Sequence, residues 1–101
     1  MKREAKFILD RPKSETETYI FLKLTCKDGV LKYSTQEKVL PTNWNHELQR
    51  TIKDRIINSQ LDRLYSIVAQ QIESSRILKK NIYKEEIRKQ YLFPLAKKFD
   101  F

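Results

Sequence analysis

Apolar and polar residues alternate on both sides of Asp28-Gly29. This two-residue period is typical of β-strands, and Asp-Gly between two such segments is a strong signal for a β-hairpin. Gly29 is the only glycine in the chain, and a mirror-image two-residue turn needs positive φ at both central positions. We therefore predict a turn at these two residues. The resulting cross-strand pairs are Lys27–Val30, Cys26–Leu31, Thr25–Lys32, Leu24–Tyr33, Lys23–Ser34 and Leu22–Thr35.

The alternation gives the hairpin two chemically different faces, because paired residues share a face. A two-stranded ribbon fits the major groove of B-DNA, where lysine binds phosphate or guanine and glutamine pairs with adenine. The alternative is a solvated sheet face whose lysines discourage aggregation. The apolar face, expected in the core, holds Ile20, Leu22, Leu24, Cys26, Leu31 and Tyr33. The opposite face, with no carboxylate, holds Phe21, Lys23, Thr25, Lys27, Lys32, Ser34 and Gln36.

A further strand is expected before the hairpin, over residues 5–11. Alternation alone does not decide which side of it faces inward, because Phe7 lies on one side and Ile8 on the other. Residues 12–18 begin with proline and contain no apolar side chain, so they are predicted to form a flexible loop. The result is a three-stranded antiparallel sheet over about residues 5–40.

The sheet is expected to end at Pro41, because proline cannot donate a ladder hydrogen bond. Val39 and Leu40 prolong the third strand up to that point. Trp44 follows among polar residues and is expected to seal one end of the core. An exposed ligand anchor is the alternative role for Trp44.

A long helix without glycine or proline is predicted over about residues 47–76. Apolar residues recur at intervals of three, four and five, so they form one stripe that would cover the apolar sheet face. A coiled-coil dimer is the alternative, although the heptad is irregular and the sheet would still need a cover. The stripe consists of Leu48, Ile52, Ile56, Leu61, Leu64, Tyr65, Val68, Ile72 and Ile77.

A shorter helix is predicted over about residues 84–92 and ends before Pro94. Glu85 and Glu86 occupy its first turn, where the helix dipole favours negative charge. Ile87 is expected to rest against the long helix or the sheet. The predicted fold class is therefore α+β: a three-stranded antiparallel sheet packed on one face by a long helix, plus a shorter C-terminal helix.

Length and composition indicate one small globular domain. The chain has 101 residues, of which 40% are hydrophobic and 34% charged, which suits a modest core and argues against disorder. Its net charge of +8 favours a polyanionic partner, nucleic acid first and an anionic membrane surface second. Residues 1–40 hold nine Lys and Arg against six Asp and Glu. Charge alone therefore does not locate the binding face.

The sequence is that of a protein expected in the cytoplasm. Cys26 is the only cysteine, so no internal disulfide is possible and a small core thiol in a reducing compartment is expected. No apolar run approaches the length of a membrane span, and the N-terminus lacks the apolar segment of a signal peptide. We expect no membrane partner.

Catalytic and metal chemistry find little support. His46 is the only histidine and has no cysteine at ligand spacing, so neither a metal nor a cofactor is expected. One glycine cannot build a glycine-rich phosphate loop. Glu85 and Glu86 are first explained by the helix dipole rather than as an acid/base pair. The chain is therefore expected to be a non-catalytic binding module.

The order of these segments resembles the N-terminal arm-type DNA-binding domain of tyrosine recombinases, the integrases of phages and conjugative transposons. The matching segments are Phe7-x-Leu9, Tyr19-Ile20-Phe21-Leu22-Lys23-Leu24-Thr25 (family I-Y-L-R-I-T), Lys32-Tyr33-Ser34-Thr35 (K-x-F-S-T), Pro41-x-x-Trp44 (P-x-x-W), Ile57-Asn58 with Leu61 (I-N-x-x-L) and Glu85-Glu86-Ile87 (E-E-I). The resemblance covers about residues 5–93. One departure is Gln36, where the family usually has glycine, and this puts the backbone after the third strand in question.

The resemblance implies an arm-type DNA-binding domain over residues 1–93 and, over 94–101, the start of a linker to core-binding and catalytic regions. The implied function is sequence-specific binding of double-stranded arm sites by the outward sheet face in the major groove. The catalytic and core-binding domains of the same polypeptide would be partners, and the isolated domain would be monomeric. No segment matches the family's catalytic motifs, so no tyrosine here inherits a catalytic role.

The expected DNA-binding residues come from the outward hairpin face and from the loop between the first two strands. They are Phe21, Lys23, Thr25, Lys27, Lys32, Ser34 and Gln36, with Arg11 and Lys13 reaching backbone phosphates. The alternative function is a protein-interaction module that docks through the long helix or a sheet edge, with lysines that serve only solubility.

Overall fold

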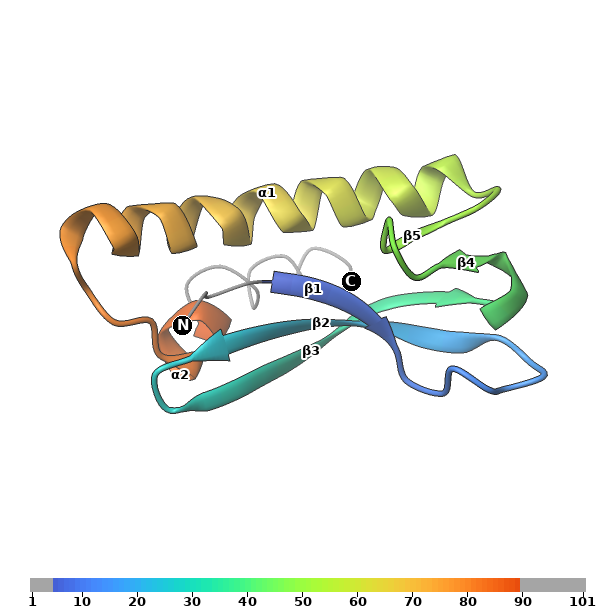
Figure 1. The fold of residues 1–101 in the computed structure, drawn as a ribbon, viewed down its shortest axis with the longest axis horizontal. Helices are drawn as coiled ribbons and strands as arrows, with labels where there is room; N and C mark the ends of the chain where they lie inside the picture. The colour runs from blue at the N-terminus through green and yellow to red at the C-terminus, as the bar shows by residue number, and fades with distance from the viewer. Residues whose placement is uncertain (1–4, 90–101) are drawn as a thin grey trace, which may run out of the picture.

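The computed structural model describes residues 5–89, and it confirms the predicted α+β class. Strands β1, β2 and β3 form one antiparallel sheet in that order, and Figure 1 shows α1 lying along one side of it. The elements are β1 (Ala5–Leu9), β2 (Thr18–Cys26), β3 (Gly29–Val39), the 3₁₀-helix η1 (Pro41–Asn43), β4 (Trp44–Asn45), β5 (Arg50–Thr51), α1 (Arg55–Leu78) and α2 (Lys84–Ile87).

The turn of the β2–β3 hairpin lies one residue earlier than predicted. Lys27 and Asp28 form the turn, and Cys26 pairs with Gly29. The predicted turn required positive φ at both Asp28 and Gly29, whereas only Gly29 has it, at +126°. The glycine is needed for its backbone freedom, as expected, but it is the first residue of β3 rather than a central turn residue.

The earlier turn shifts the predicted register by two residues. Leu24 lies opposite Leu31, where the prediction placed Tyr33. A shift of two residues preserves the alternation of faces, whereas a shift of one would have exchanged them. The predicted inner face is therefore confirmed: its members on β2 and Leu31 are buried, and Tyr33 is partly buried against the core.

The pairing of β2 and β3 is interrupted around Gln36, where residues 35–37 of β3 lie opposite the single residue Ile20. Gln36 has a φ of +65°, in the left-handed region that glycine adopts most easily. Neighbouring hydroxyl groups form hydrogen bonds with backbone groups at the irregularity. The hydroxyl of Ser34 accepts from the Gln36 N–H at 3.2 Å, and that of Thr35 donates to the Ile20 carbonyl at 2.8 Å. The irregularity lets β3 bend and continue to Val39 in the sheet.

The core lies between the inner sheet face and α1. Trp44 is buried at one end, which confirms the packing role over the exposed-anchor alternative, and Cys26 is buried as predicted. α1 contributes the stripe Leu61, Leu64 and Val68 to this core. The largest fully buried side chains are Ile20, Leu22, Leu24, Leu31, Leu61 and Val68.

The predicted start of the long helix near residue 47 is wrong, because α1 begins at Arg55. Residues 44–51 instead form the small β4–β5 ladder, in which Trp44 pairs with Thr51. The side chain of Asn58 holds this ladder against the helix: its amide oxygen accepts from the Thr51 N–H at 2.7 Å, and its NH₂ donates to the Thr51 carbonyl at 3.0 Å. The spacing of apolar residues along the sequence gives no sign of these hydrogen bonds.

Asp54 caps the N-terminus of α1. One oxygen of its carboxylate accepts hydrogen bonds from the N–H groups of Ile56 and Ile57, at 3.1 and 3.0 Å. Aspartate is a favoured residue at this position because it satisfies helix donors that lack intrahelical partners. The helix ends at Leu78, and the next residue, Lys79, closes the last turn with a left-handed φ of +54°.

The predicted apolar stripe is buried only in its middle. Leu61, Leu64, Val68 and Ile72 cover the sheet as predicted. Two of the exposed members precede the first residue of the helix, two lie in its first and last turns, and Tyr65 is 40% exposed with its ring centre 6.4 Å from that of Phe7. These exposed members are Leu48, Ile52, Ile56, Tyr65 and Ile77.

The β4–β5 hairpin also covers part of the free edge of β1. The backbone N–H of Phe7 donates to the side-chain oxygen of Gln49 at 2.8 Å. Arg50 lies over the Phe7 ring, with its guanidinium carbon 5.1 Å from the ring centre, and its Nε donates to Asp62 of α1 at 2.8 Å. One side chain of this hairpin thus links β1 to α1.

α2 is tied to the tip of the β2–β3 hairpin. The Lys84 N–H, at the start of α2, donates to the carboxylate of Asp28 at 3.1 Å, and the Lys27 N–H donates to the Ile82 carbonyl at 2.7 Å. Ile87 is buried, as predicted. The predicted helix end at 90–92 and the predicted linker at 94–101 lie outside the described residues.

We expect Asp54→Ala to lower the free energy of unfolding by about 1 kcal/mol, because two helix N–H groups lose their acceptor. Urea unfolding followed by circular dichroism measures the change. A helix that began near residue 47 would place Asp54 in its interior, where alanine is the better helix former and the variant would be more stable. The exposed Glu47→Ala is the control, with an expected change within about 0.5 kcal/mol.

We expect Gln36→Gly to raise the free energy of unfolding by up to about 1 kcal/mol. A left-handed conformation costs an L-residue roughly 1–2 kcal/mol, which exceeds the roughly 0.5–1 kcal/mol entropic cost of glycine. Gln36→Val should destabilise by about 1 kcal/mol or more, because a β-branched side chain tolerates this region poorly. Equal stability of all three proteins in urea unfolding would contradict the backbone conformation at this position.

Candidate nucleic-acid interface

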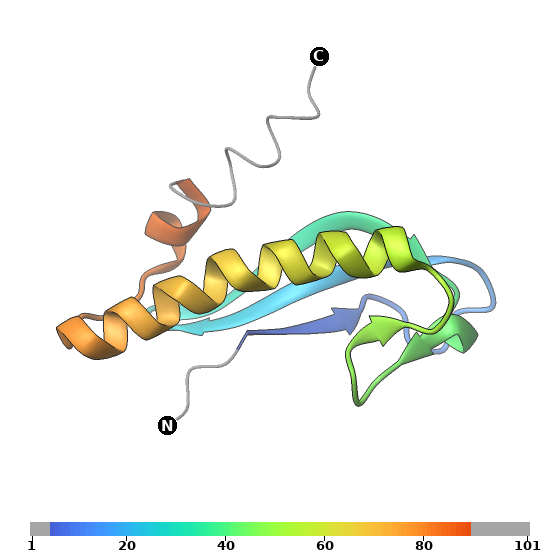
Figure 2. The same ribbon diagram turned by 90° about the horizontal axis from the view of Figure 1, so that it is seen from above.

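The outer face of the sheet is the side opposite α1, as both views show (Figures 1 and 2). The ambiguity about β1 is resolved because Ala5, Phe7 and Leu9 are buried, so the intervening residues point outward with the polar face of the hairpin. We define the outer face by its residues: Lys6, Ile8, Asp10, Tyr19, Phe21, Lys23, Thr25, Val30, Lys32, Ser34 and Lys38.

One lysine from each strand forms a row across the outer face. Lys6 pairs with Lys23, and Lys23 pairs with Lys32. Neighbouring strands lie about 4.8 Å apart, so the row spans roughly 10 Å. Like charges directly opposite each other destabilise a sheet. Repulsion between Lys6 and Lys23 therefore opposes folding and would be relieved by an anionic partner, whereas the Lys32 ammonium is turned toward Asp10.

The ammonium of Lys32 lies over the middle strand rather than beyond the edge of β3. It is 4.5 Å from the ring centre of Phe21 on β2 and 3.6 Å from the carboxylate of Asp10, just past the end of β1. Cations bind the faces of aromatic rings in this range. The predicted hairpin face itself carries no carboxylate, but Asp10, from the end of β1, adds one to the outer face, and we refer to the two residues as the Asp10–Lys32 pair.

A second lysine on the outer face also covers an aromatic ring. The ammonium of Lys38 is 4.8 Å from the ring centre of Tyr19, which is its partner across the strands. The outer face thus carries aromatic rings on β2 with a cation from β3 above each.

The structure brings five of the predicted site residues together on the outer face and separates the other four. The five are Phe21, Lys23, Thr25, Lys32 and Ser34. Lys27 lies in the hairpin turn, because the turn is one residue earlier than predicted, and Gln36 is exposed at the irregularity in β3. Arg11 and Lys13 are exposed in the loop between β1 and β2, at the opposite end of the sheet from Lys27 (Figure 1).

Six outer-face residues were absent from the predicted site: Lys6, Ile8, Asp10, Tyr19, Val30 and Lys38. Lys38 continues the alternation of β3 by two residues beyond Gln36, so the sequence signal was present. Lys6 and Asp10 share one side of β1, but their direction depended on which side of that strand is buried. The proximity of Asp10 to Lys32 requires the three-dimensional order of the strands.

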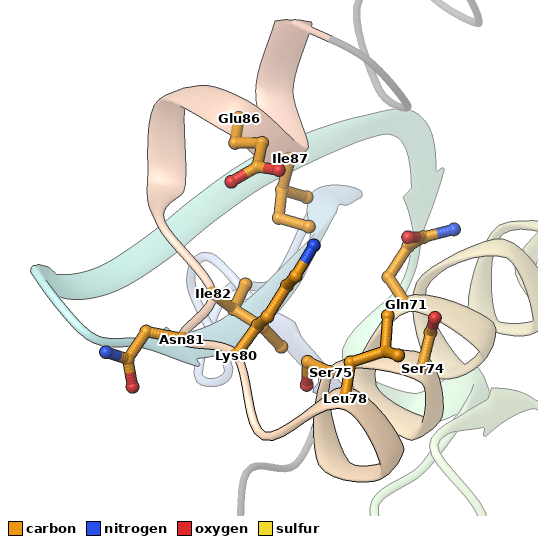
Figure 3. Close-up of a pocket in the computed structure, with 9 residues that line it drawn as sticks. All are labelled: Gln71, Ser74, Ser75, Leu78, Lys80, Asn81, Ile82, Glu86 and Ile87. Atoms are coloured by element: carbon orange, nitrogen blue, oxygen red, sulfur yellow. The ribbon is translucent and has the colours of Figure 1, made fainter.

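A separate pocket lies between the end of α1 and α2, and Figure 3 shows its lining residues from α1, the connecting segment and α2, among them Gln71, Lys80, Ile82 and Glu86. Its volume of about 180 Å³ is below the roughly 300–1,000 Å³ of typical small-molecule sites. Within residues 5–89, no cluster of His, Cys, Asp and Glu side chains is arranged to hold a metal ion. The outer face is therefore the stronger candidate site.

Burial raises the pKa of the Tyr33 phenol, on the inner side of the sheet behind this face. The low-polarity surroundings disfavour the phenolate. The phenol therefore stays protonated at pH values at which an unfolded-state tyrosine has already ionised.

Comparison of the chain with family models, curated proteins and solved structures gives no match. Within the described part of the chain, no helix has the length and apolar character needed to cross a bilayer.

We expect the free energy of unfolding to fall as the pH rises above about 10, the ordinary pKa of tyrosine. In that range the unfolded chain releases the Tyr33 proton while the folded protein keeps it, so the unfolded state binds fewer protons and the slope of stability with pH is negative. Urea unfolding at several pH values should show a shallower fall for Tyr33→Phe than for the parent. Tyr83→Phe, an exposed control, should leave the slope unchanged, and identical slopes for both variants would contradict this role of burial.

Proposed function

We propose that this chain is a non-catalytic module that binds double-stranded DNA sequence-specifically, with the outer face of the sheet in the major groove. The observation that carries the proposal is the row of Lys6, Lys23 and Lys32, because like charges placed opposite one another weaken a sheet. A polyanionic ligand compensates that repulsion. The net charge of +8 favours the same class of partner.

The position of each strand suggests a division of roles on the duplex. Side chains of the middle strand, such as Lys23 and Thr25, point toward the floor of the groove and are suited to base edges. Lys6 on β1 and Lys38 on β3 belong to the flanking strands. Rotation of the exposed Lys38 side chain off the Tyr19 ring would bring its ammonium to a phosphate of the groove wall. The roughly 10 Å row is compatible with a major groove about 12 Å wide.

Cations at the ends of the sheet extend the proposed contact surface. Arg11 and Lys13 at one end and Lys27 at the other are separated by the length of β2, whose nine residues span about 30 Å. That length corresponds to roughly nine base pairs along B-DNA. These residues would contact phosphates near the two ends of the site.

The resemblance to arm-type domains of phage and transposon integrases supports the same proposal. Gln36, the departure from the family pattern, has a φ of +65°, a backbone region in which glycine is the usual residue. On this proposal the chain positions a recombinase on arm-type DNA in the cytoplasm, and core-binding and catalytic domains of the same polypeptide perform strand exchange.

A second candidate, a protein-interaction module, is favoured by one feature outside the sheet. Ile77 is 70% exposed, and Leu78 and Tyr83 beside it in sequence are also exposed, near the junction of α1 and α2. An amide NMR titration with duplex DNA separates the two functions. DNA binding predicts shifts concentrated in β2 and β3, whereas a protein-interaction role predicts no shifts in those strands.

We expect Lys6→Ala combined with Lys38→Ala to flatten the salt dependence of duplex binding. Each lost phosphate contact reduces the slope of log K against log[salt] by about 0.9, so the double variant should lose nearly 2 units. Fluorescence anisotropy at several salt concentrations measures the slope. The control is Lys53→Ala with Arg63→Ala, which removes the same charge from exposed positions before and within α1.

The control variant should keep the parent slope. An equal loss of slope in both double variants would mean that net charge, rather than the outer face, determines binding. No loss in the outer-face variant would exclude the proposed phosphate contacts of Lys6 and Lys38.

A further inference from the structure

We propose that the Asp10–Lys32 pair recognises one G·C base pair, with Lys32 donating to guanine and Asp10 accepting from the amino group of the paired cytosine. This inference rests on the proposed DNA-binding function and assigns a specificity role to two residues of the outer face. Asp10 is central to this inference, because a carboxylate on a DNA-binding surface repels the phosphates unless it has a partner on the bases.

The geometry holds a donor beside an acceptor over the middle of the sheet. The Lys32 ammonium is 3.6 Å from the Asp10 carboxylate, and both side chains remain partly exposed, at 50% and 38%. The Phe21 ring, with its centre 4.5 Å from the ammonium, supports the cation from below. Lys32 therefore extends from β3 across β2 toward Asp10, away from where a groove-wall phosphate would lie.

The anchoring of Asp10 fixes the acceptor side of the pair. Its backbone N–H donates to the Tyr19 carbonyl at 2.9 Å, which continues the β1–β2 ladder past the end of β1. The side chain consequently projects from the outer face at a defined position. Exposed ion pairs contribute little to stability, so folding alone gives weak reason to place a carboxylate here.

The major-groove edge of a G·C pair complements this arrangement. Guanine presents two acceptors, N7 and O6, and the neighbouring cytosine presents the N4 amino donor. An ammonium with three donors suits the guanine acceptors, and a carboxylate suits the cytosine amino group. A carboxylate near the phosphate walls would instead be repelled. The pair should therefore lower non-specific affinity and favour G·C at one position of the site.

The test is selection of duplexes from a randomised library by the full 101-residue chain, compared with Asp10→Asn and Lys32→Ala. Each variant should lose about tenfold in its preference for G·C at one and the same position, with other positions retained. Asp10→Asn should also bind mixed-sequence duplex at least as tightly as the parent, because one negative charge is removed. Circular dichroism confirms that each variant is folded.

Two control variants test whether the change in base preference is specific to the Asp10–Lys32 pair. Glu17→Gln removes an exposed carboxylate from the β1–β2 loop, and Lys6→Ala removes the lysine at the far end of the row. Both should leave the base preference unchanged, although Lys6→Ala should weaken binding to all sequences. A change of preference in Glu17→Gln equal to that in Asp10→Asn would overturn the inference.

The outcomes separate this inference from the function on which it rests. A parent chain that binds and enriches a motif, with the same preference in Asp10→Asn and Lys32→Ala, retains the DNA-binding proposal and overturns the base assignment. Effects of the two variants at different positions, or selection of A·T at the affected position, overturn it as well. Absence of duplex binding by the folded parent chain overturns both proposals.

Discussion

The burial of the apolar sheet face beneath α1 is the contact on which the rest of the structure depends. Leu61, Leu64 and Val68 cover residues of the middle strand that are fully removed from solvent. Because strand side chains alternate, burial of this face also determines which lysines and aromatic residues point to the outer face. The outer face is thus a consequence of how the core is formed.

The hairpin illustrates how much of this arrangement the sequence determines. The alternation of residues 19–35 predicts both faces correctly even though the turn lies one residue earlier than predicted. The resulting two-residue shift moves Lys27 into the turn but leaves the other predicted members of these residues on their predicted sides. The exact turn was not predictable from Asp28-Gly29 alone. It is stabilised by bonds to Ile82 and Lys84, which are distant in the sequence.

The start of α1 shows the limit of hydrophobic periodicity. Leu48 and Ile52 continue the spacing of the helical stripe, yet they lie in and after the β4–β5 hairpin and are exposed. The decisive interactions are polar: Asn58 binds the backbone of Thr51, and Asp54 caps the helix. For the candidate site, the same limit applies to Asp10, whose position beside Lys32 depends on strand order.

The hydrogen bond from the Phe7 N–H to the side chain of Gln49 has a consequence for how the sheet can grow. A strand from another molecule would need that same donor to extend the ladder at β1. At the opposite edge, the bend at Gln36 interrupts the straight run of β3 that such an addition requires. Both borders of the sheet therefore resist stacking of further strands, and a surface rich in β-structure can remain available for a ligand without promoting fibre formation.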